Sequence, residues 1–164
     1  MTGPVAVRVF PGLAEESRQA HRWVRALMAA SCAVAADDGE LAAAELFANA
    51  IRHTRSGAPG GMVTIAVTAD GVIHVHDQGT AEGLPCAGLA AGWPADGSLL
   101  ADSGRGLSIV AALCAGWGCM PAARCRAAGP DDPAAQDGGC CAWCRPESWP
   151  PGRGREQRAA HADA

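Results

Sequence analysis

The sequence contains no lysine and no tyrosine: all 13 of its basic side chains are arginines, and its aromatic residues are five tryptophans and two phenylalanines. Without lysine the chain cannot contain the phosphate-binding P-loop, whose motif requires that residue. With so few aromatic residues, the core must be tightly packed and built mainly from small apolar side chains. The formal net charge is −4 and there is no basic stripe, which argues against a nucleic-acid-binding role.

Signals for export and for membrane insertion are also missing. No uninterrupted apolar run approaches the roughly 18–20 residues of a membrane-spanning helix. Residues 1–10 lack the basic start and the apolar block of a secretory signal. We therefore expect a cytoplasmic protein with no membrane role, and we expect its eight cysteines to form no disulfide framework.

The length of 164 residues predicts one domain. We place this domain at residues 1–146 and expect a disordered tail at 147–164. Hydrophobic periodicity predicts strands at 5–9, 62–69, 72–76, 122–127 and 140–145, and helices at 14–30, at 38–54 and from Gly106 onward. We expect Asp37 or Asp38 to cap the second helix, and Leu41 and Phe47 to belong to its buried stripe.

This order of elements, with a long loop at 77–103, predicts an α/β (α+β) two-layer sandwich. The sheet is expected to be mixed, mostly antiparallel, and covered on one face by helices. Asp70-Gly71 between two alternating apolar runs is a strong hairpin signal, so the strands on either side of it are expected to pair antiparallel.

Two groups of polar residues are candidates for chemistry. Glu45 and Asn49 lie four residues apart at the margin of the second helix's apolar stripe, where they either line a cavity or form a solvated helix edge. Asp77 follows a strand and precedes Gly79. Its carboxylate either accepts a hydrogen bond from the amino group of a ligand or forms an ordinary Asx turn.

A third group, Gly104-Arg105-Gly106-Leu107, opens the third predicted helix. Free backbone N–H groups at the start of a helix bind anions such as phosphates. The glycines permit close approach, and Arg105 adds a positive charge. A lone Gly-x-Gly also commonly ends a loop, so this group gains its meaning from the other two.

Three segments, in this order along the chain, resemble the histidine-kinase-like (GHKL) ATPases, and specifically the small bacterial anti-sigma-factor serine/threonine kinases. The segment ELFANAIRHTRSG (45–57) resembles the N box of the family, VHDQG (75–79) its first glycine box, and SGRGLSIVAALCAGWG (103–118) its second. The resemblance covers roughly residues 5–145 and implies the Bergerat, or histidine-kinase-like, ATPase fold.

The resemblance also implies a role for each matched residue. Asn49 would hold the Mg²⁺ that bridges the phosphates of ATP, and Glu45 would be the general base. Asp77 would bind the adenine amino group, and Gly79 would let the ring pack closely. The phosphates would lie against the start of the third helix, formed by Gly104, Arg105, Gly106 and Leu107. Residues 80–103 would form a lid over ATP.

The implied activity is transfer of a phosphate from ATP to a serine or threonine of a small anti-sigma-factor antagonist. A sigma factor would then be controlled by partner switching, in many members from within a homodimer. The alternative is an ATP-binding regulatory module that sequesters a protein partner without kinase activity. Cys141 bears on this choice, because the family commonly has a threonine there that assists adenine binding, and a thiol forms poorer hydrogen bonds than a hydroxyl.

A third hypothesis is a metal or redox protein based on its cysteines. A zinc site can be drawn around Cys141-x-x-Cys144 with Cys140, Cys125 and Cys119. A second Cys-x-x-Cys is missing, however, and adjacent cysteines on a strand point to opposite faces. We therefore expect buried or incidental thiols.

His74 and His76 share one face of a predicted strand. Ile73 and Val75 take the core side of that strand. Both histidines are therefore expected to be exposed to solvent.

Overall fold

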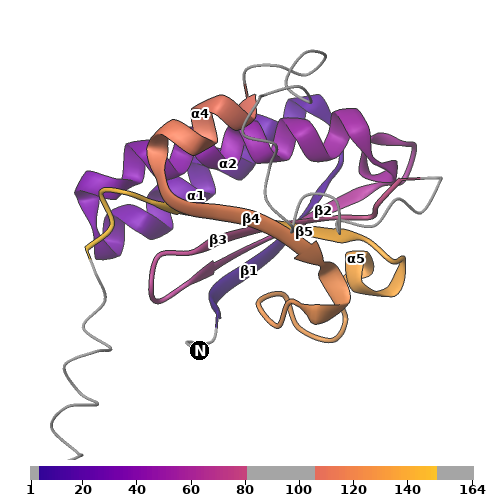
Figure 1. The fold of residues 1–164 in the computed structure, drawn as a ribbon. Coiled ribbons are helices and arrows are strands. Elements are labelled where there is room, and N and C mark those ends of the chain that lie inside the picture. Colours follow the sequence, from indigo (N-terminus) through magenta and orange to yellow (C-terminus); the bar gives the residue numbers. More distant parts are fainter. Residues whose placement is uncertain (1–3, 81–105, 151–164) are drawn as a thin grey trace, which may run out of the picture.

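A computed structural model describes residues 4–80 and 106–150 of the chain. They form a five-stranded sheet in the order β1-β2-β3-β5-β4 with long helices packed on one face (Figure 1). The strands are β1 (Pro4–Pro11), β2 (Met62–Thr68), β3 (Ile73–Asp77), β4 (Cys114–Pro121) and β5 (Cys140–Pro146). The helices are α1 (Ser17–Ser31), α2 (Ala33–His53), α4 (Gly106–Leu113) and α5 (Pro133–Gln136), with 3-10 turns η1 (Ala14–Glu16), η2 (Arg55–Gly57) and η4 (Ala122–Arg124).

The predicted two-layer α/β fold is confirmed, because the strands and helices follow one another as expected and the helices cover one face of the sheet. Each strand pair of the described residues is antiparallel, where a mixed, mostly antiparallel sheet was expected. The predicted hairpin joins β2 to β3, and Gly71 in its turn has a φ of +78°, which favours glycine.

Small residues allow α1 and α2 to approach each other closely. Helix α1 buries Ala20, Val24 and Met28, which recur every four residues on one face. A Cβ atom at Gly39 of α2 would lie only 2.1 Å from Sδ of Met28. The core therefore follows the small-residue composition that the sequence predicts.

The start of α2 differs from the expected start at residue 38. The helix begins at Ala33, and Cys32 alone separates it from α1. The two expected N-caps lie inside the helix, where they hold neighbouring segments instead. Asp37 accepts a hydrogen bond of 2.7 Å from Arg25, and Asp38 accepts one of 2.6 Å from Ser148.

The second face of the sheet is partly covered by the segment between β4 and β5, which contains η4 and α5 (Figure 1). The strand expected at 122–127 is wrong. The pairing of β4 with β5 already begins at Cys114 and ends at Pro121, which has no N–H to continue a ladder. The chain then turns through η4 and packs against β3 and β2 on the face of the sheet opposite the helices.

The chain also stays packed beyond the expected domain boundary at residue 146. The N–H of Glu147 donates to the carbonyl of Leu113 over 2.9 Å, and Trp149 is only 8% exposed. A Cβ atom at Gly71 would lie 2.1 Å from the Trp149 ring, so the indole covers the β2–β3 turn. Residues 151–164 of the expected tail lie outside the described residues. No helix in the described ranges is both long and apolar enough to cross a membrane.

Candidate functional site

The first and third candidate groups meet where α2 packs against the start of α4. Glu45 and Asn49 lie one turn apart on α2, and both are half-buried. Gly106, the first residue of α4, is buried against them. A Cβ atom at Gly106 would lie 2.6 Å from Oε2 of Glu45 and 3.7 Å from Nδ2 of Asn49. The close approach therefore depends on glycine at this position.

This arrangement places a carboxylate, an amide and a helix N-terminus at one point of the molecule. The first backbone N–H groups of a helix have no partner within it and attract anions. The carboxylate of Glu45 repels a phosphate, so its position beside such a site contributes nothing to anion binding. A base that accepts a proton from an attacking hydroxyl does fit this place.

Asp77 lies at the end of β3, where a local turn fixes its carboxylate. Oδ1 accepts a hydrogen bond of 2.7 Å from the N–H of Gly79. Gly79 has a φ of +72°, a conformation that favours glycine. Burial raises the pKa of the Asp77 carboxyl, while the backbone N–H groups of Gly79 and Cys140 oppose that shift. The Asx turn that the sequence allowed is therefore present, with a partly buried carboxylate.

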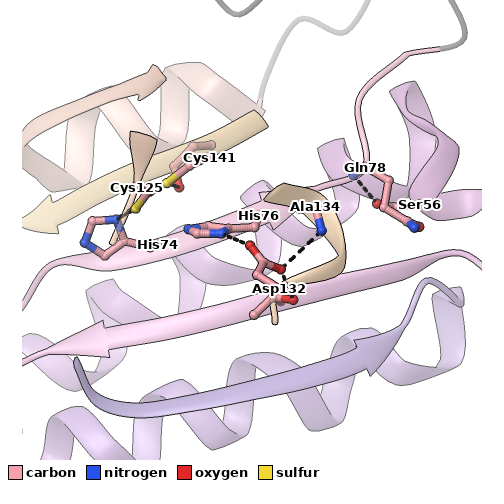
Figure 2. Close-up of polar contacts among 10 residues, drawn as sticks. Ser56, His74, His76, Gln78, Cys125, Asp132, Ala134 and Cys141 are labelled. Carbon is pink, nitrogen blue, oxygen red and sulfur yellow. Dashed lines mark hydrogen bonds and ion pairs between the residues drawn. The ribbon is translucent and has the colours of Figure 1, made fainter. Parts of the chain in front are cut away.

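Two residues that were not predicted as site residues, Arg55 and Ser56, hold this turn against the end of α2. The guanidinium of Arg55 donates to the carbonyls of Gln78 and Asp137, both over 2.6 Å, and its backbone N–H donates to the Gly79 carbonyl. Ser56 accepts a hydrogen bond of 2.9 Å from the Gln78 N–H (Figure 2). Because Arg55 and Ser56 lie within the N-box segment, that segment both carries Glu45 and Asn49 and anchors the loop after Asp77.

Not every predicted site residue is tested by this geometry. Leu107 is half-buried, and its side chain packs against the hydrophobic core. Gly104 and Arg105 lie outside the described residues, as does nearly all of the predicted lid at 80–103. Their roles toward ATP remain predictions.

The structure corrects the expected place of Cys141. This residue pairs with His76 across β5 and β3, so the two side chains share a face of the sheet. Its Sγ lies 3.5 Å from Nδ1 of His74. Successive strand residues point to opposite faces, so Asp77 faces the helix layer and Cys141 faces away from it. Cys141 therefore does not line a pocket around Asp77, and its thiol gives no reason to doubt adenine binding.

The two histidines are less exposed than expected. His76 is fully buried rather than exposed, and His74 is half-buried, because the segment between β4 and β5 covers their face of the sheet. Cys144 belongs to the core on the helix side, so Cys141 and Cys144, from which a zinc site could be drawn in the sequence, lie on opposite faces of the sheet. Such cover by a distant segment has no signal in local periodicity.

Residues 10–115, more than half of the chain, match the family of histidine kinase-like ATPase domains. Together with the two-layer fold, this match shows that the chain belongs to that family. It is thus an ATP-binding, kinase-like domain, and the matched region contains the N box and the first glycine box. None of the curated proteins compared with the chain matches it significantly.

Proposed function

We propose that this chain is an ATP-dependent serine/threonine protein kinase of the anti-sigma-factor type. One observation carries the proposal: the carboxylate of Glu45 lies against Gly106 at the N-terminus of α4, beside Asn49. ATP binding alone has no use for a negative charge at that point, whereas phosphoryl transfer to a hydroxyl needs a base there. The proposed substrate is a serine or threonine of a small anti-sigma-factor antagonist.

In this mechanism each residue has a separate task. Asp77 accepts a hydrogen bond from the adenine amino group and orients the adenine ring. Backbone N–H groups at the start of α4 hold the phosphates, with Gly104 and Arg105 expected to contribute. Asn49 would hold Mg²⁺ through its amide oxygen, and the ion would neutralise phosphate charge. Glu45 takes the proton from the attacking hydroxyl, a bond forms between that oxygen and the γ-phosphorus, and the bond from the γ-phosphorus to the oxygen of ADP breaks as ADP leaves.

The proposed regulatory output is partner switching. The chain would bind a sigma factor in one state and phosphorylate the anti-sigma-factor antagonist in another. It would do so as a homodimer, as many members of the group it resembles do. These partners are inferred from the resemblance of the three boxes. No nucleic-acid or membrane partner is proposed.

Titration of the purified full chain with Mg-ATP tests the nucleotide site. We expect wild-type protein to bind ATP and Asn49→Ala to lose measurable binding, because the substitution removes the ligand that links the metal to α2. Leu41→Ala is the matched control, since this side chain is 44% exposed on the same helix. Absence of ATP binding in the wild type would refute the proposed kinase.

Glu45→Ala separates the kinase from the binding module that sequesters a partner without phosphorylating it. We expect ATP affinity to be retained, and transfer of labelled γ-phosphate to a panel of small anti-sigma-factor antagonists to fall by about 10²–10⁴-fold, the usual contribution of a general base. If the wild type binds ATP but labels none of these proteins, the binding module is the correct function. Loss of ATP binding in Glu45→Ala would make Glu45 a structural residue instead.

A further inference from the structure

Four side chains with metal-binding atoms converge on the face of the sheet opposite the helices. His74 and His76 come from β3, Cys141 comes from β5, and Cys125 comes from the segment that follows η4 (Figure 2). Their ligand atoms all lie within 4.8 Å of one another. Nδ1 of His74 lies 3.4 Å from Sγ of Cys125 and 3.5 Å from Sγ of Cys141.

His76 brings an independent observation that points to a ligand. Its side chain is fully buried, yet Nε2 has no hydrogen-bond partner. The other ring nitrogen, Nδ1, is bonded to Oδ2 of Asp132 over 2.5 Å (Figure 2). A buried polar atom without a partner is costly, and native structures rarely leave one without a reason. A metal ion at Nε2 supplies that reason.

Asp132 is hydrogen-bonded to His76 and holds its ring in place, as residues next to metal ligands commonly do. Its Oδ1 accepts hydrogen bonds from Thr64 over 2.8 Å and from the N–H of Ala134 over 3.3 Å. The carboxylate is thus fixed, and its bond to Nδ1 of His76 leaves the lone pair on Nε2. A carboxylate that orients a metal-binding histidine is a recurrent feature of zinc sites.

The donor set selects the metal. Two thiolates and two imidazoles are a frequent set in structural, four-coordinate Zn²⁺ sites. Tetrahedral bonds of about 2.3 Å to sulfur and 2.0–2.1 Å to nitrogen put the ligand atoms roughly 3.3–3.8 Å apart. The observed group needs only a small contraction to reach that geometry. Two thiolates also balance the charge of the ion, so the ion and its four ligands together are neutral.

We propose that His74, His76, Cys125 and Cys141 bind one Zn²⁺ ion in a structural site. Two thiol protons leave for solvent as the ion binds. Cys140 pairs with Asp77 and so lies on the opposite face of the sheet from Cys141, and it takes no part. Since four protein ligands fill a tetrahedron, no position stays open for a substrate, and the ion serves to fasten the segment between β4 and β5 onto the sheet.

The position of this site separates it from the nucleotide chemistry. Cys125 and Asp132 lie beyond residue 115, where the match to the ATPase family ends. His76 and Asp77 are adjacent on β3 but point to opposite faces of the sheet. Two of the four ligands, Cys125 and Cys141, therefore lie outside the matched region, and the zinc proposal holds whether or not the chain is a kinase.

Metal analysis of the full chain tests the proposal. The protein is produced without a histidine tag, purified under reducing conditions without chelator, and measured by elemental mass spectrometry. We expect about one equivalent of zinc in the wild type, and Cys125→Ser and His76→Ala to lose most of it. Cys32→Ser is the matched control, because this half-buried thiol lies between α1 and α2 and should leave the zinc content unchanged.

Two further measurements keep the proposal falsifiable if a variant folds poorly. Wild-type protein reconstituted with Co²⁺ should show the strong visible bands of a tetrahedral thiolate site. Asp132→Asn, which keeps all four ligands, should weaken zinc affinity by about 10–100-fold. Less than about a tenth of an equivalent in reduced wild type supplied with Zn²⁺ would overturn the proposal. Equal zinc loss in Cys32→Ser and Cys125→Ser would show adventitious thiol binding, and so would overturn it too.

Discussion

At the scale of single residues, Asp77 combines a local role with a proposed functional one. Its Oδ1 accepts the Gly79 N–H, which closes the turn after β3. A carboxylate has about four lone-pair sites, so the turn leaves acceptor capacity for an adenine amino group. The two interpretations that the sequence left open are compatible, and only a substitution can separate them.

Asp77→Asn makes that separation. Asparagine keeps an Oδ1 acceptor for the turn but replaces the second oxygen with a donor. We expect the free energy of unfolding to change little and ATP affinity to fall about 10- to 100-fold, since a hydrogen bond to a charged group contributes about 1.5–3 kcal/mol. Calorimetric titration with ATP and thermal unfolding of the same samples measure both. Unchanged ATP affinity would leave Asp77 as a turn residue only.

His76 shows why a residue can be placed on a strand from sequence and still be misjudged. Alternation correctly predicts that it lies on the same face as His74 and opposite Val75. Whether that face is exposed depends on Asp132, 56 residues away, and Cys125, 51 residues from His74. No local pattern contains that information.

At the scale of elements, α2 shows the difference between detecting a helix and knowing its buried face. Its periodicity predicts a helix, but the expected stripe included Leu41, which is 44% exposed, as well as Phe47, which is fully buried. The structure buries Ala42, Ala43, Leu46 and Ala50 together with Phe47. Small residues let α1 and the sheet approach α2 closely. The alanine-rich side of α2 therefore packs inward, and Leu41 is left on the outer side.

A pair of truncations on α2 tests this orientation. We expect Phe47→Ala to lower the free energy of unfolding by about 3–5 kcal/mol, because it leaves a cavity among tightly packed neighbours. Leu41→Ala should change it by about 0.5 kcal/mol or less, as exposed positions usually do. Chemical denaturation of both variants gives the comparison, and a larger loss for Leu41→Ala would mean that α2 buries the other face.

Strand β1 also shows that the sequence predicts an element without predicting which of its faces is buried. Alternation predicts the strand, yet Val7 and Val9 are 40% and 42% exposed, while Phe10 is buried in the core. The guanidinium of Arg8 lies 4.8 Å from the Phe10 ring centre and covers it. A period of two defines which residues share a face, but the packing of α1 decides which face is inside.

At the scale of the whole molecule, the end of the described chain returns to the core. Trp149 covers the β2–β3 turn at Gly71, and Ser148 bonds to Asp38 on α2. Residues far apart in sequence are thereby joined across the fold. The tail expected from its composition therefore includes a segment that contributes to packing.

Truncation of that side chain measures the contribution. We expect Trp149→Ala to lower the free energy of unfolding by about 2–3 kcal/mol, the value for burial of one large apolar side chain. Glu147→Ala is the control, because its side chain is exposed and its structural bond uses the backbone N–H. Equal stability of Trp149→Ala and wild type by chemical denaturation would show that this contact does not stabilise the domain.

The sequence by itself determined most of the strands and helices, the hairpin and the ordered boxes of the ATPase family, because each depends on residues close together in the chain. It also determined the candidate residues Glu45, Asn49 and Asp77. It did not determine strand β4 or the start of α2. Only the tertiary structure decided which faces are buried and that Gly106 meets Glu45. Likewise, only the fold brought Cys125 and Asp132 against the histidines of β3. These contacts join distant segments. They are stabilised by packing and by hydrogen bonds between buried polar groups, which no local pattern encodes.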